Sequence, residues 1–557
     1  WYAFILGPLL MLTEVAGEVL LPSFMADIIN IGAANHDVGY IVQKGIIMIL
    51  TALIMMAGGV GGAWFASVAA INFGAGLRKD AFKKIQTFSF SEIDRFSTGS
   101  LVTRLTNDIT QVQNLIMMAL RMMLRAPGML IGAIIMAFLM NRELAAVFLV
   151  ILPVMTVAII LLLRIAYPRF EFMQKKLDAL NSNIQEVLTN VRVIKSFVRE
   201  DYESARFEKS NAELKESSLN AFKIAVAQMP LMMLFMNLTT LVVVWLGGNQ
   251  ILDGKMQVGD LTAFTTYIVQ VLMSLMMLAM VFLQSSRAFA SGRRINEVMD
   301  TQVSLTDDHA AYPEAVVKSG KIEFQNVSFR YYKDSAEKVL DQINLTIEPG
   351  QMIGIIGSTG CGKTTLVSMI PRLYDVDEGK VLVDGIDVRD YSLKHLREGV
   401  GMVLQKNVLF SGTIEENLQW GDENASKDQI RKAAESAQAE GFIQKLADGY
   451  DTELGQGGVN VSGGQKQRLC IARALLKRPK ILILDDSTSA VDTATEAKIR
   501  EAFSTTLKET TKLIIAQRIG SVMEADQIVV MDEGKIVGLG KHEDLLETCK
   551  AYQEIYD

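Results

Sequence analysis

A glycine-rich segment that ends in lysine and threonine carries the clearest chemical signal in the chain. It follows the apolar run 352–356 and reads Gly357, Ser358, Thr359, Gly360, Cys361, Gly362, Lys363 and Thr364, after which Thr365 opens a predicted helix. The pattern GxxxxGK[ST] between a buried strand and a helix is that of a P-loop, whose backbone N–H groups surround phosphates. Lys363 would place its charge on the β- and γ-phosphates, and Thr364 would offer a hydroxyl to Mg²⁺. We therefore predict that residues 357–365 bind ATP with Mg²⁺.

An acidic strand and a glycine-containing helix start accompany this loop. The run Ile481–Asp486 reads as a buried strand that ends in two acids, of which Asp485 is predicted to hold Mg²⁺ through water. Directly before a predicted helix at 466–477 stand Ser462, Gly463, Gly464 and Gln465. Free backbone N–H groups at such a helix start favour a negatively charged phosphate.

Together these segments resemble the ABC transporter family, whose signature is usually LSGGQ and is Val461 followed by 462–465 in this chain. The resemblance implies further site residues. Tyr331 matches the aromatic residue that stacks on adenine, Gln405 matches the Q-loop glutamine near ATP and Mg²⁺, and the run 489–492 matches the D-loop. Two chains of this family pair head to tail, so Ser462, Gly463, Gly464 and Gln465 would act in trans on a nucleotide held by a partner.

Two positions depart from the pattern of hydrolytic family members. Asp486 stands where they carry glutamate, and Gln517 stands where they carry histidine. A base must approach the attacking water to about 2.6–3.2 Å, and aspartate is one methylene shorter than glutamate, which can cost on the order of a hundredfold in rate. Glutamine can donate a hydrogen bond but cannot carry imidazolium charge. We predict a Walker site that binds ATP but hydrolyses it poorly; the alternative is neutral change in an active homodimer.

Before residue 290 the chain has six apolar segments, each long enough for a helix that crosses a bilayer of about 30 Å. The segments are 3–25, 45–71, 115–139, 144–163, 224–248 and 261–284. The long loops 72–114 and 164–223 are rich in Lys and Arg, which predicts that they and both chain ends face the cytoplasm. Their apolar residues keep a helical period, so we expect the helices to extend well beyond the membrane.

Four ionisable residues lie inside the predicted spans. Glu14 and Glu18 are one helical turn apart in the first span, and Arg121 and Arg125 have the same spacing in the third. Charges at this depth are costly and usually face a partner or a wet cavity. A Glu–Arg pair between the two spans is the first interpretation, and a cavity acid that attracts cationic substrates is the second.

Composition limits the remaining possibilities. The net charge of −7 argues against nucleic acid as a partner. The three cysteines, Cys361, Cys470 and Cys549, show no spacing pattern, which predicts a reducing compartment without disulfides. We expect no cleavable signal peptide before the first apolar run. These features predict a multi-pass protein of a bacterial cytoplasmic membrane, with its nucleotide-binding domain in the cytoplasm.

The order of the two halves is similar to that of an ABC exporter half-transporter of the multidrug type. We expect a six-helix transmembrane domain at 1–302, a linker at 303–320 and an α/β P-loop NTPase domain of ABC type at 321–557. The predicted function is an ATP-binding subunit of an exporter of hydrophobic or amphipathic compounds, whether small molecule, lipid or peptide. Its predicted partner is a homologous half-transporter with the Walker B glutamate and the switch histidine. An exporter-shaped importer and an ATP-gated regulator or channel are the alternatives.

Overall fold

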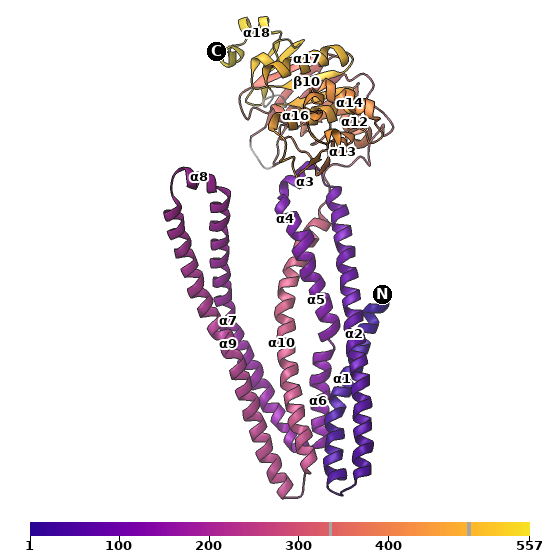
Figure 1. Cartoon of the computed structure of the whole chain (residues 1–557), viewed down its shortest axis with the longest axis vertical. Coiled ribbons are helices and arrows are strands. Elements are labelled where there is room, and N and C mark those ends of the chain that lie inside the picture. The colour runs from indigo at the N-terminus through magenta and orange to yellow at the C-terminus, as the bar shows by residue number, and fades with distance from the viewer. Residues whose placement is uncertain (334–336, 487–491, 557) are drawn as a thin grey trace. The chain divides into compact units, whose positions relative to one another are not determined.

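The computed structural model of the chain describes residues 1–333, 337–486 and 492–556, the side chains at 282–284, 286, 493 and 506 excepted. It contains two compact units (Figure 1). The first comprises Trp1–Ile85 and Gly99–Thr301, and the second comprises Gln86–Thr98 and Gln302–Asp557. The segment Gln86–Thr98 thus groups with the second unit, although it lies within the range 1–302 predicted as the transmembrane domain.

Long helices build the first unit. Within the described residues, six helical segments are long and apolar enough to cross a membrane, which confirms the predicted number: Tyr2–Ala33, Val38–Gln86, Thr98–Met140, Arg142–Thr189, Glu200–Leu252 and Val258–Val281. In the order of the chain, the elements of residues 1–301 are α1 (Tyr2–Asp27), the π-helix η1 (Ile28–Ala33), α2 (Val38–Gln86), α3 (Phe90–Arg95), α4 (Thr98–Thr103), the π-helix η2 (Arg104–Asp108), α5 (Ile109–Met122), α6 (Arg125–Met140), α7 (Arg142–Thr189), α8 (Val191–Ser196), α9 (Glu200–Leu252) and α10 (Val258–Asp300). Of these, α3 belongs to the second unit.

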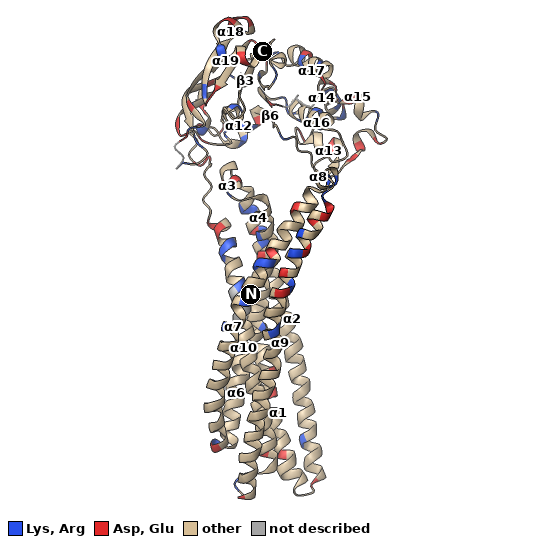
Figure 2. Ribbon diagram, turned by 90° about the vertical axis from the view of Figure 1, so that its left-hand side faces the viewer, with Lys and Arg blue, Asp and Glu red and all other residues tan. Residues whose placement is uncertain are grey.

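The helices α7 and α9 run far past their apolar stretches, as their periodicity predicts. Near α8 both carry many Lys, Arg, Asp and Glu residues, whereas their opposite ends are almost free of charge (Figure 2). Ion pairs join the charged parts, with Lys176 Nζ 2.7 Å from Glu213 Oε2 and Arg206 Nη2 3.0 Å from Glu186 Oε2. Charged faces of this kind belong in water, so these ends extend beyond the apolar layer.

Helix α1 packs closely on α2 and α10. A Cβ atom added at Gly58 of α2 would lie 2.9 Å from the carbonyl oxygen of Leu10, so this contact requires glycine. Pro22 interrupts the hydrogen-bond ladder of α1, because it has no N–H to donate to the carbonyl of Glu18. Gln270 of α10 fills this gap by donating from Nε2 to that carbonyl oxygen at 2.8 Å.

The described residues of the second unit contain three sheets. The largest has the strand order β12-β11-β3-β10-β9-β6, in which β11, β3, β10, β9 and β6 pair in parallel and β12 (Lys535–Gly540) is antiparallel to β11. The five parallel strands are β3 (Met352–Gly357), β6 (Val400–Val403), β9 (Ile481–Asp485), β10 (Thr511–Ile515) and β11 (Gln527–Asp532). The antiparallel sheet consists of β1 (Ile322–Phe329), β2 (Leu340–Ile347), β4 (Glu378–Val383) and β5 (Ile386–Asp387), and the smallest of β7 (Gly412–Thr413) and β8 (Glu453–Leu454).

Both faces of the parallel sheet are covered. In β9, Leu482 and Leu484 belong to one buried cluster, which includes residues of α16, and Ile481 and Ile483 belong to another, which includes residues of β1 and β2. Burial on both faces explains why the strand reads as a continuous apolar run.

Besides α3, the α-helices of this unit are α11 (Lys363–Ser368), α12 (Leu393–Gly399), α13 (Ile414–Gln419), α14 (Lys427–Ser436), α15 (Glu440–Ile443), α16 (Gly463–Leu476), α17 (Thr493–Thr506), α18 (His542–Thr548) and α19 (Lys550–Tyr556). Short 3-10 turns are η3 (Val388–Asp390), η4 (Gly449–Asp451) and η5 (Ile519–Ser521).

Candidate nucleotide site

The parallel register gathers the predicted site residues at one edge of the sheet. Strand β10 lies between β3 and β9, and its last residue, Ile515, is level with Ile355 and with Asp485. The P-loop follows β3, Asp486 follows β9, and Gln517 lies two residues after β10. Ligands of open parallel sheets bind at the carboxyl ends of the strands, which is this edge.

The P-loop connects β3 to α11 through two glycines in the left-handed region, Gly360 with φ 86° and Gly362 with φ 97°. A Cβ at Gly362 would lie 2.7 Å from the carbonyl oxygen of Val339, so neither the backbone angle nor the space admits another residue. Lys363 donates from Nζ to the carbonyl oxygens of Gly357 and Ser358, each at 2.7 Å. The ammonium group therefore lies against the loop that is predicted to hold the phosphates.

A hydroxyl and a carboxylate lie together beside the loop. Thr364 donates from Oγ1 to the carboxylate of Asp485, at 3.0 Å from Oδ1 and 2.9 Å from Oδ2. Asp485 is only 2% exposed; this burial raises the pKa of its carboxyl group, and the hydrogen bond from Thr364 opposes the rise. Mg²⁺ prefers such hard oxygen ligands and keeps several waters, so these two residues fit the ion together with ATP phosphates. Mg²⁺ would supply charge neutralisation of those phosphates.

The two departing residues contact each other. Gln517 donates from Nε2 to Oδ2 of Asp486 at 2.7 Å. Burial raises the pKa of Asp486, and hydrogen bonds from Gln405 and Gln517 lower it, with a net rise. The backbone of Asp486 has φ 48°, and its N–H donates to the carbonyl oxygen of Ile515 at 3.1 Å. The side-chain amides of Gln405 and Gln517 therefore both hydrogen-bond to the carboxylate of Asp486.

The predicted adenine contact lies on an aromatic cluster. Tyr331 is 44% exposed, and its ring packs edge-on against Phe329 and Tyr374, with centroid distances of 5.1 Å and 5.3 Å. Its hydroxyl is 2.9 Å from Oγ1 of Thr365. Thr365 is predicted as part of the phosphate loop, yet its side chain is buried and bonds to Tyr331. Tyr374 carries no motif, so the sequence alone did not reveal it.

The signature residues form the start of α16. Ser462 is the N-cap: Oγ accepts from the backbone N–H of Gln465 at 3.3 Å, and Oε1 of Gln465 accepts from the N–H of Ser462 at 2.9 Å. This capping box uses the side chain of Gln465, and leaves Gly463 and Gly464 as the first helical positions, whose N–H groups have no acceptor within the helix. The predicted role of this segment in trans stays a prediction.

Of the predicted D-loop, residues 489–491 lie outside the described part of the chain. Asp492 is described, and it caps α17 by accepting a hydrogen bond at Oδ1 from the N–H of Thr495 at 3.0 Å.

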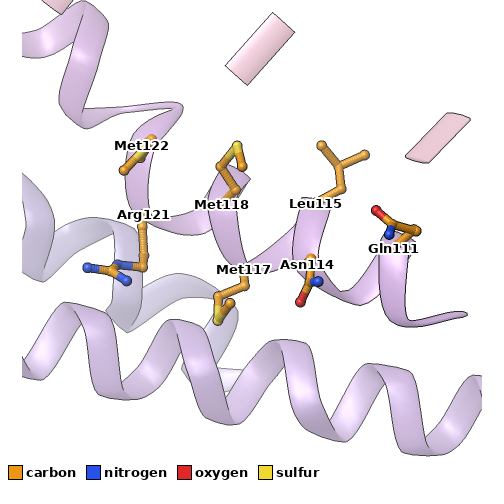
Figure 3. Close-up of a pocket in the computed structure, with 7 residues that line it drawn as sticks. All are labelled: Gln111, Asn114, Leu115, Met117, Met118, Arg121 and Met122. Carbon is orange, nitrogen blue, oxygen red and sulfur yellow. The ribbon is translucent and has the colours of Figure 1, made fainter. Parts of the chain in front are cut away.

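In the first unit, the predicted Glu–Arg pairing is confirmed for one arginine. Nη2 of Arg125 lies 3.1 Å from Oε1 of Glu14 and 3.3 Å from Oε2 of Glu18, so one guanidinium serves both acids. The pairing is wrong for Arg121, which among the described residues has no ion pair. Arg121 instead lines a cavity of about 360 Å³ along α5 (Figure 3). The other lining residues are Gln111, Asn114, Leu115, Met117, Met118 and Met122.

Comparison with known proteins decides the family. Residues 4–275 match the model of the ABC transporter transmembrane region, and residues 340–489 match the ABC transporter model. An uncharacterised ABC transporter ATP-binding protein of Bacillus subtilis strain 168, YfiB, is 43% identical over 549 residues, which cover 99% of this chain and 95% of the relative. This chain is an ABC transporter.

The solved structures agree on the architecture of the ABC transporter. A bacterial Atm1-family ABC exporter with ATP bound aligns with a TM-score of 0.83 at 25% identity, over 99% of this chain and 98% of the other. The ATP-dependent lipid A-core flippase of Desulfotalea psychrophila is 34% identical over 481 residues, which cover 86% of this chain and 83% of the flippase. The fused arrangement of transmembrane and ATP-binding domains is thus that of an ABC exporter half-transporter.

Proposed function

We propose that this chain is the hydrolysis-impaired subunit of a heterodimeric exporter. Its own Walker site would hold ATP with Mg²⁺, and its signature would complete the site of a homologous partner that carries the glutamate and the histidine. ATP cleavage would then occur mainly at the partner's site, while ATP on this chain keeps the two nucleotide domains together.

The hydrogen bond between Asp486 and Gln517 carries this proposal. A general base must have a free carboxylate oxygen facing the attacking water. Oδ2 of Asp486 accepts from Gln517 at 2.7 Å, and a second amide, that of Gln405, also bonds to this carboxylate. The carboxylate is therefore engaged by two amides, and its side chain is one methylene shorter than that of the glutamate it replaces. In contrast, Lys363, Thr364 and Asp485 keep the types and contacts that phosphate and Mg²⁺ require.

We further propose an amphipathic substrate, with lipids as a candidate class. Two of the relatives, from Desulfotalea psychrophila and Syntrophus aciditrophicus, are named as lipid A-core flippases. The cavity on α5 combines one guanidinium and two amides with methionine and leucine side chains. Unbranched thioethers adapt to varied apolar shapes, and Arg121 would favour an acidic or polar head group. The paired acids Glu14 and Glu18 are less suited to attract a cation, since Arg125 lies between them.

The test separates binding from turnover. Purified without a partner, the chain should bind Mg²⁺-ATP but hydrolyse it slowly. In the assembled complex, Ser462→Arg should nearly abolish ATPase activity, because a bulky cation at the start of α16 would block the partner's nucleotide. Asp486→Asn should reduce it far less. Rapid turnover by the isolated chain, or the reverse ranking of the two variants, would contradict the proposal.

A further inference from the structure

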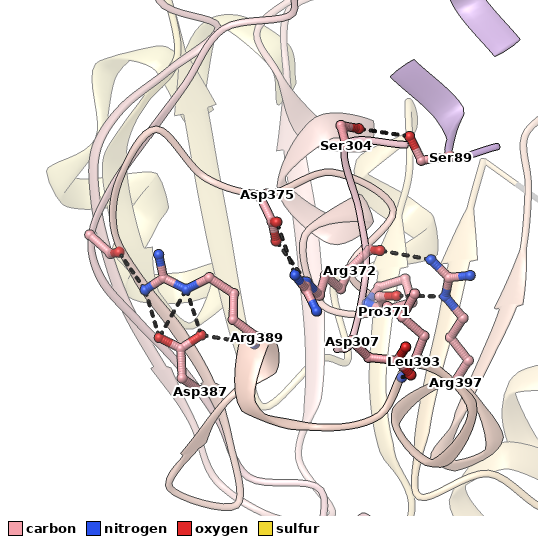
Figure 4. Close-up of polar contacts among 11 residues, drawn as sticks. Ser89, Ser304, Asp307, Pro371, Arg372, Asp375, Asp387, Arg389, Leu393 and Arg397 are labelled. Carbon is pink, nitrogen blue, oxygen red and sulfur yellow. Dashed lines mark hydrogen bonds and ion pairs between the residues drawn. The ribbon is translucent and has the colours of Figure 1, made fainter. Parts of the chain in front are cut away.

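The connection between α11 and β4 is held in a fixed shape, although it carries no family motif. Arg372 is 5% exposed and has φ 49°, in the left-handed region that non-glycine residues rarely adopt. Its guanidinium forms two hydrogen bonds with the carboxylate of Asp375, at 2.7 Å and 3.0 Å (Figure 4). Arg397 of α12 donates to the carbonyl oxygens of Pro371 and Arg372, at 3.1 Å and 2.8 Å. Such strained turns persist only where the surroundings define them.

This connection presents Tyr374 to the ring of Tyr331. The two rings lie edge to face, with a centroid distance of 5.3 Å and an interplanar angle of 88°, and both also contact Phe329. Because the hydroxyl of Tyr331 bonds to Thr365 of α11, its ring is fixed at one end by the P-loop helix and along its edge by Tyr374. A shift of Tyr374 would therefore tilt the ring of Tyr331.

The other side of Tyr374 faces α3. The ring of Phe90 lies 6.0 Å from that of Tyr374, and the Tyr374 hydroxyl donates to Oδ2 of Asp94 at 2.7 Å. Burial and the neighbouring Asp94 raise the pKa of Tyr374, so the hydroxyl keeps its proton and remains a donor at neutral pH.

A serine cluster secures α3 itself. Glu92 accepts hydrogen bonds from the N–H of Ser89 at 2.8 Å, from Oγ of Ser91 at 3.0 Å and from the N–H of Ser304 at 3.2 Å. Oγ of Ser89 and Oγ of Ser304 are 3.0 Å apart (Figure 4). The helix is thus tied to the segment after α10, and α3 is in turn the short helix that lies between the long helix α2 and α4 along the chain.

We infer that Tyr374 is a positioning residue for ATP, which links the orientation of α3 to the ring of Tyr331. The inference rests on the proposed contact of Tyr331 with adenine. By linkage, if α3 affects the affinity for ATP through Tyr374, then ATP affects α3 by the same factor. The nucleotide site would in this way influence the loop between α2 and α4 of its own chain.

Tyr391 provides a matched comparison. It lies in the same unit, it is fully buried, and its hydroxyl donates to the carbonyl oxygen of Val383 at 3.0 Å. Tyr391→Phe therefore removes a tyrosine hydrogen bond of similar length without touching α3 or Tyr331. Any general effect of losing such a bond will appear in both variants.

The experiment measures binding of Mg²⁺-ATP and of inorganic tripolyphosphate to the full-length chain in lipid nanodiscs. Tyr374→Phe should weaken ATP binding about threefold to tenfold, the range expected for one hydrogen bond, and leave tripolyphosphate binding unchanged because that ligand has no base. Tyr391→Phe should alter neither. Unchanged ATP affinity in Tyr374→Phe, or an equal loss for both ligands, would overturn the inference.

A mutant cycle tests the link to α3. Asp94→Ala should weaken ATP binding as Tyr374→Phe does, the double variant should be no weaker than either, and Asp94→Asn, which keeps an acceptor oxygen, should recover most of the affinity. ATP should also slow amide hydrogen exchange in residues 90–95 of the wild type but not of Tyr374→Phe. Additive losses, or protection that survives in Tyr374→Phe, would exclude the link. If the wild-type chain binds no ATP, the proposed function itself fails, which is a distinguishable result.

Discussion

Two pairs of acids in this transporter, all buried or half-buried, are stabilised in different ways. In the first unit, Glu14 and Glu18 share the guanidinium of Arg125 at 3.1 Å and 3.3 Å, so a cation is built into the protein. In the second unit, Asp485 and Asp486 contact the hydroxyl of Thr364 and the amide of Gln517, and burial raises the pKa of both acids. The first cluster already contains its cation, whereas the second is suited to receive a cation together with the nucleotide.

The largest expected effect concerns the second cluster. The double change Asp486→Glu and Gln517→His should raise ATP turnover of the isolated chain by about a hundredfold, since it restores both the reach of the base and a chargeable partner. Asp486→Glu alone should gain much less, because the amide of Gln517 would still hold the carboxylate. Steady-state phosphate release measures this. Equal turnover in the wild type and the double variant would show that these two residues do not limit hydrolysis.

The next effect breaks the first cluster. Arg125→Met should destabilise the chain by about 1–3 kcal/mol, because it leaves two half-buried acids without their cation. Adding Glu14→Gln and Glu18→Gln should recover part of this loss. Arg121→Met is the control. It should leave thermal stability nearly unchanged, and it should weaken binding of amphipathic anions. Thermal unfolding in nanodiscs gives the comparison, and strictly additive losses would argue against the shared pair.

The smallest effect distinguishes the clusters by pH. Because the folded-state pKa of Asp485 is raised, its charge destabilises the nucleotide-free protein above that pKa, and the penalty disappears as the pH falls below the unfolded value. Asp485→Asn should therefore stabilise the nucleotide-free chain at pH 8, and stabilise it less at pH 5, while Mg²⁺-ATP no longer protects the variant. Thermal unfolding with and without Mg²⁺-ATP checks both parts.

Asp384→Asn is the matched control with the opposite sign. Asp384 accepts hydrogen bonds from Ser319 and from backbone N–H groups including that of Lys321, which outweigh burial and lower its pKa. Its stabilisation is present above the unfolded pKa of about 4 and is lost as the pH falls through the folded value. The variant should thus be less stable at pH 8. A stabilised Asp384→Asn, or a destabilised Asp485→Asn, would contradict this account.

The sequence predicted those parts of the site whose chemistry is local. The P-loop and the pair of Thr364 with Asp485 follow from motif spacing, because strand ends of a parallel sheet meet at one edge. The contact between Asp486 and Gln517 depends on the register of β9 against β10, which spacing alone does not specify. Tyr374 left no signal, because an aromatic residue in a connection has no periodicity.

The choice between Arg121 and Arg125 shows a second limit. Both residues have the same helical spacing, so a continuous helix would place them on one face. The structure ends α5 at Met122 and starts α6 at Arg125, and this break separates the two side chains. The number of spans was predictable because hydropathy is cumulative over about 20 residues, and the charged extensions of α7 and α9 were predictable from the helical period of their apolar residues.

The bond from Gln270 to the carbonyl of Glu18 has a mechanical consequence. In hydrocarbon, a carbonyl group without a hydrogen-bond donor destabilises the protein by several kcal/mol, and Pro22 has no N–H group to act as that donor. Sliding α10 along α1 by even one residue would remove the donor, and Tyr267, whose hydroxyl bonds to the carbonyl of Val19 at 2.9 Å, would lose its acceptor in the same step. We therefore expect α1 and α10 to move as one rigid body during transport, with any bending confined to segments outside these two hydrogen bonds.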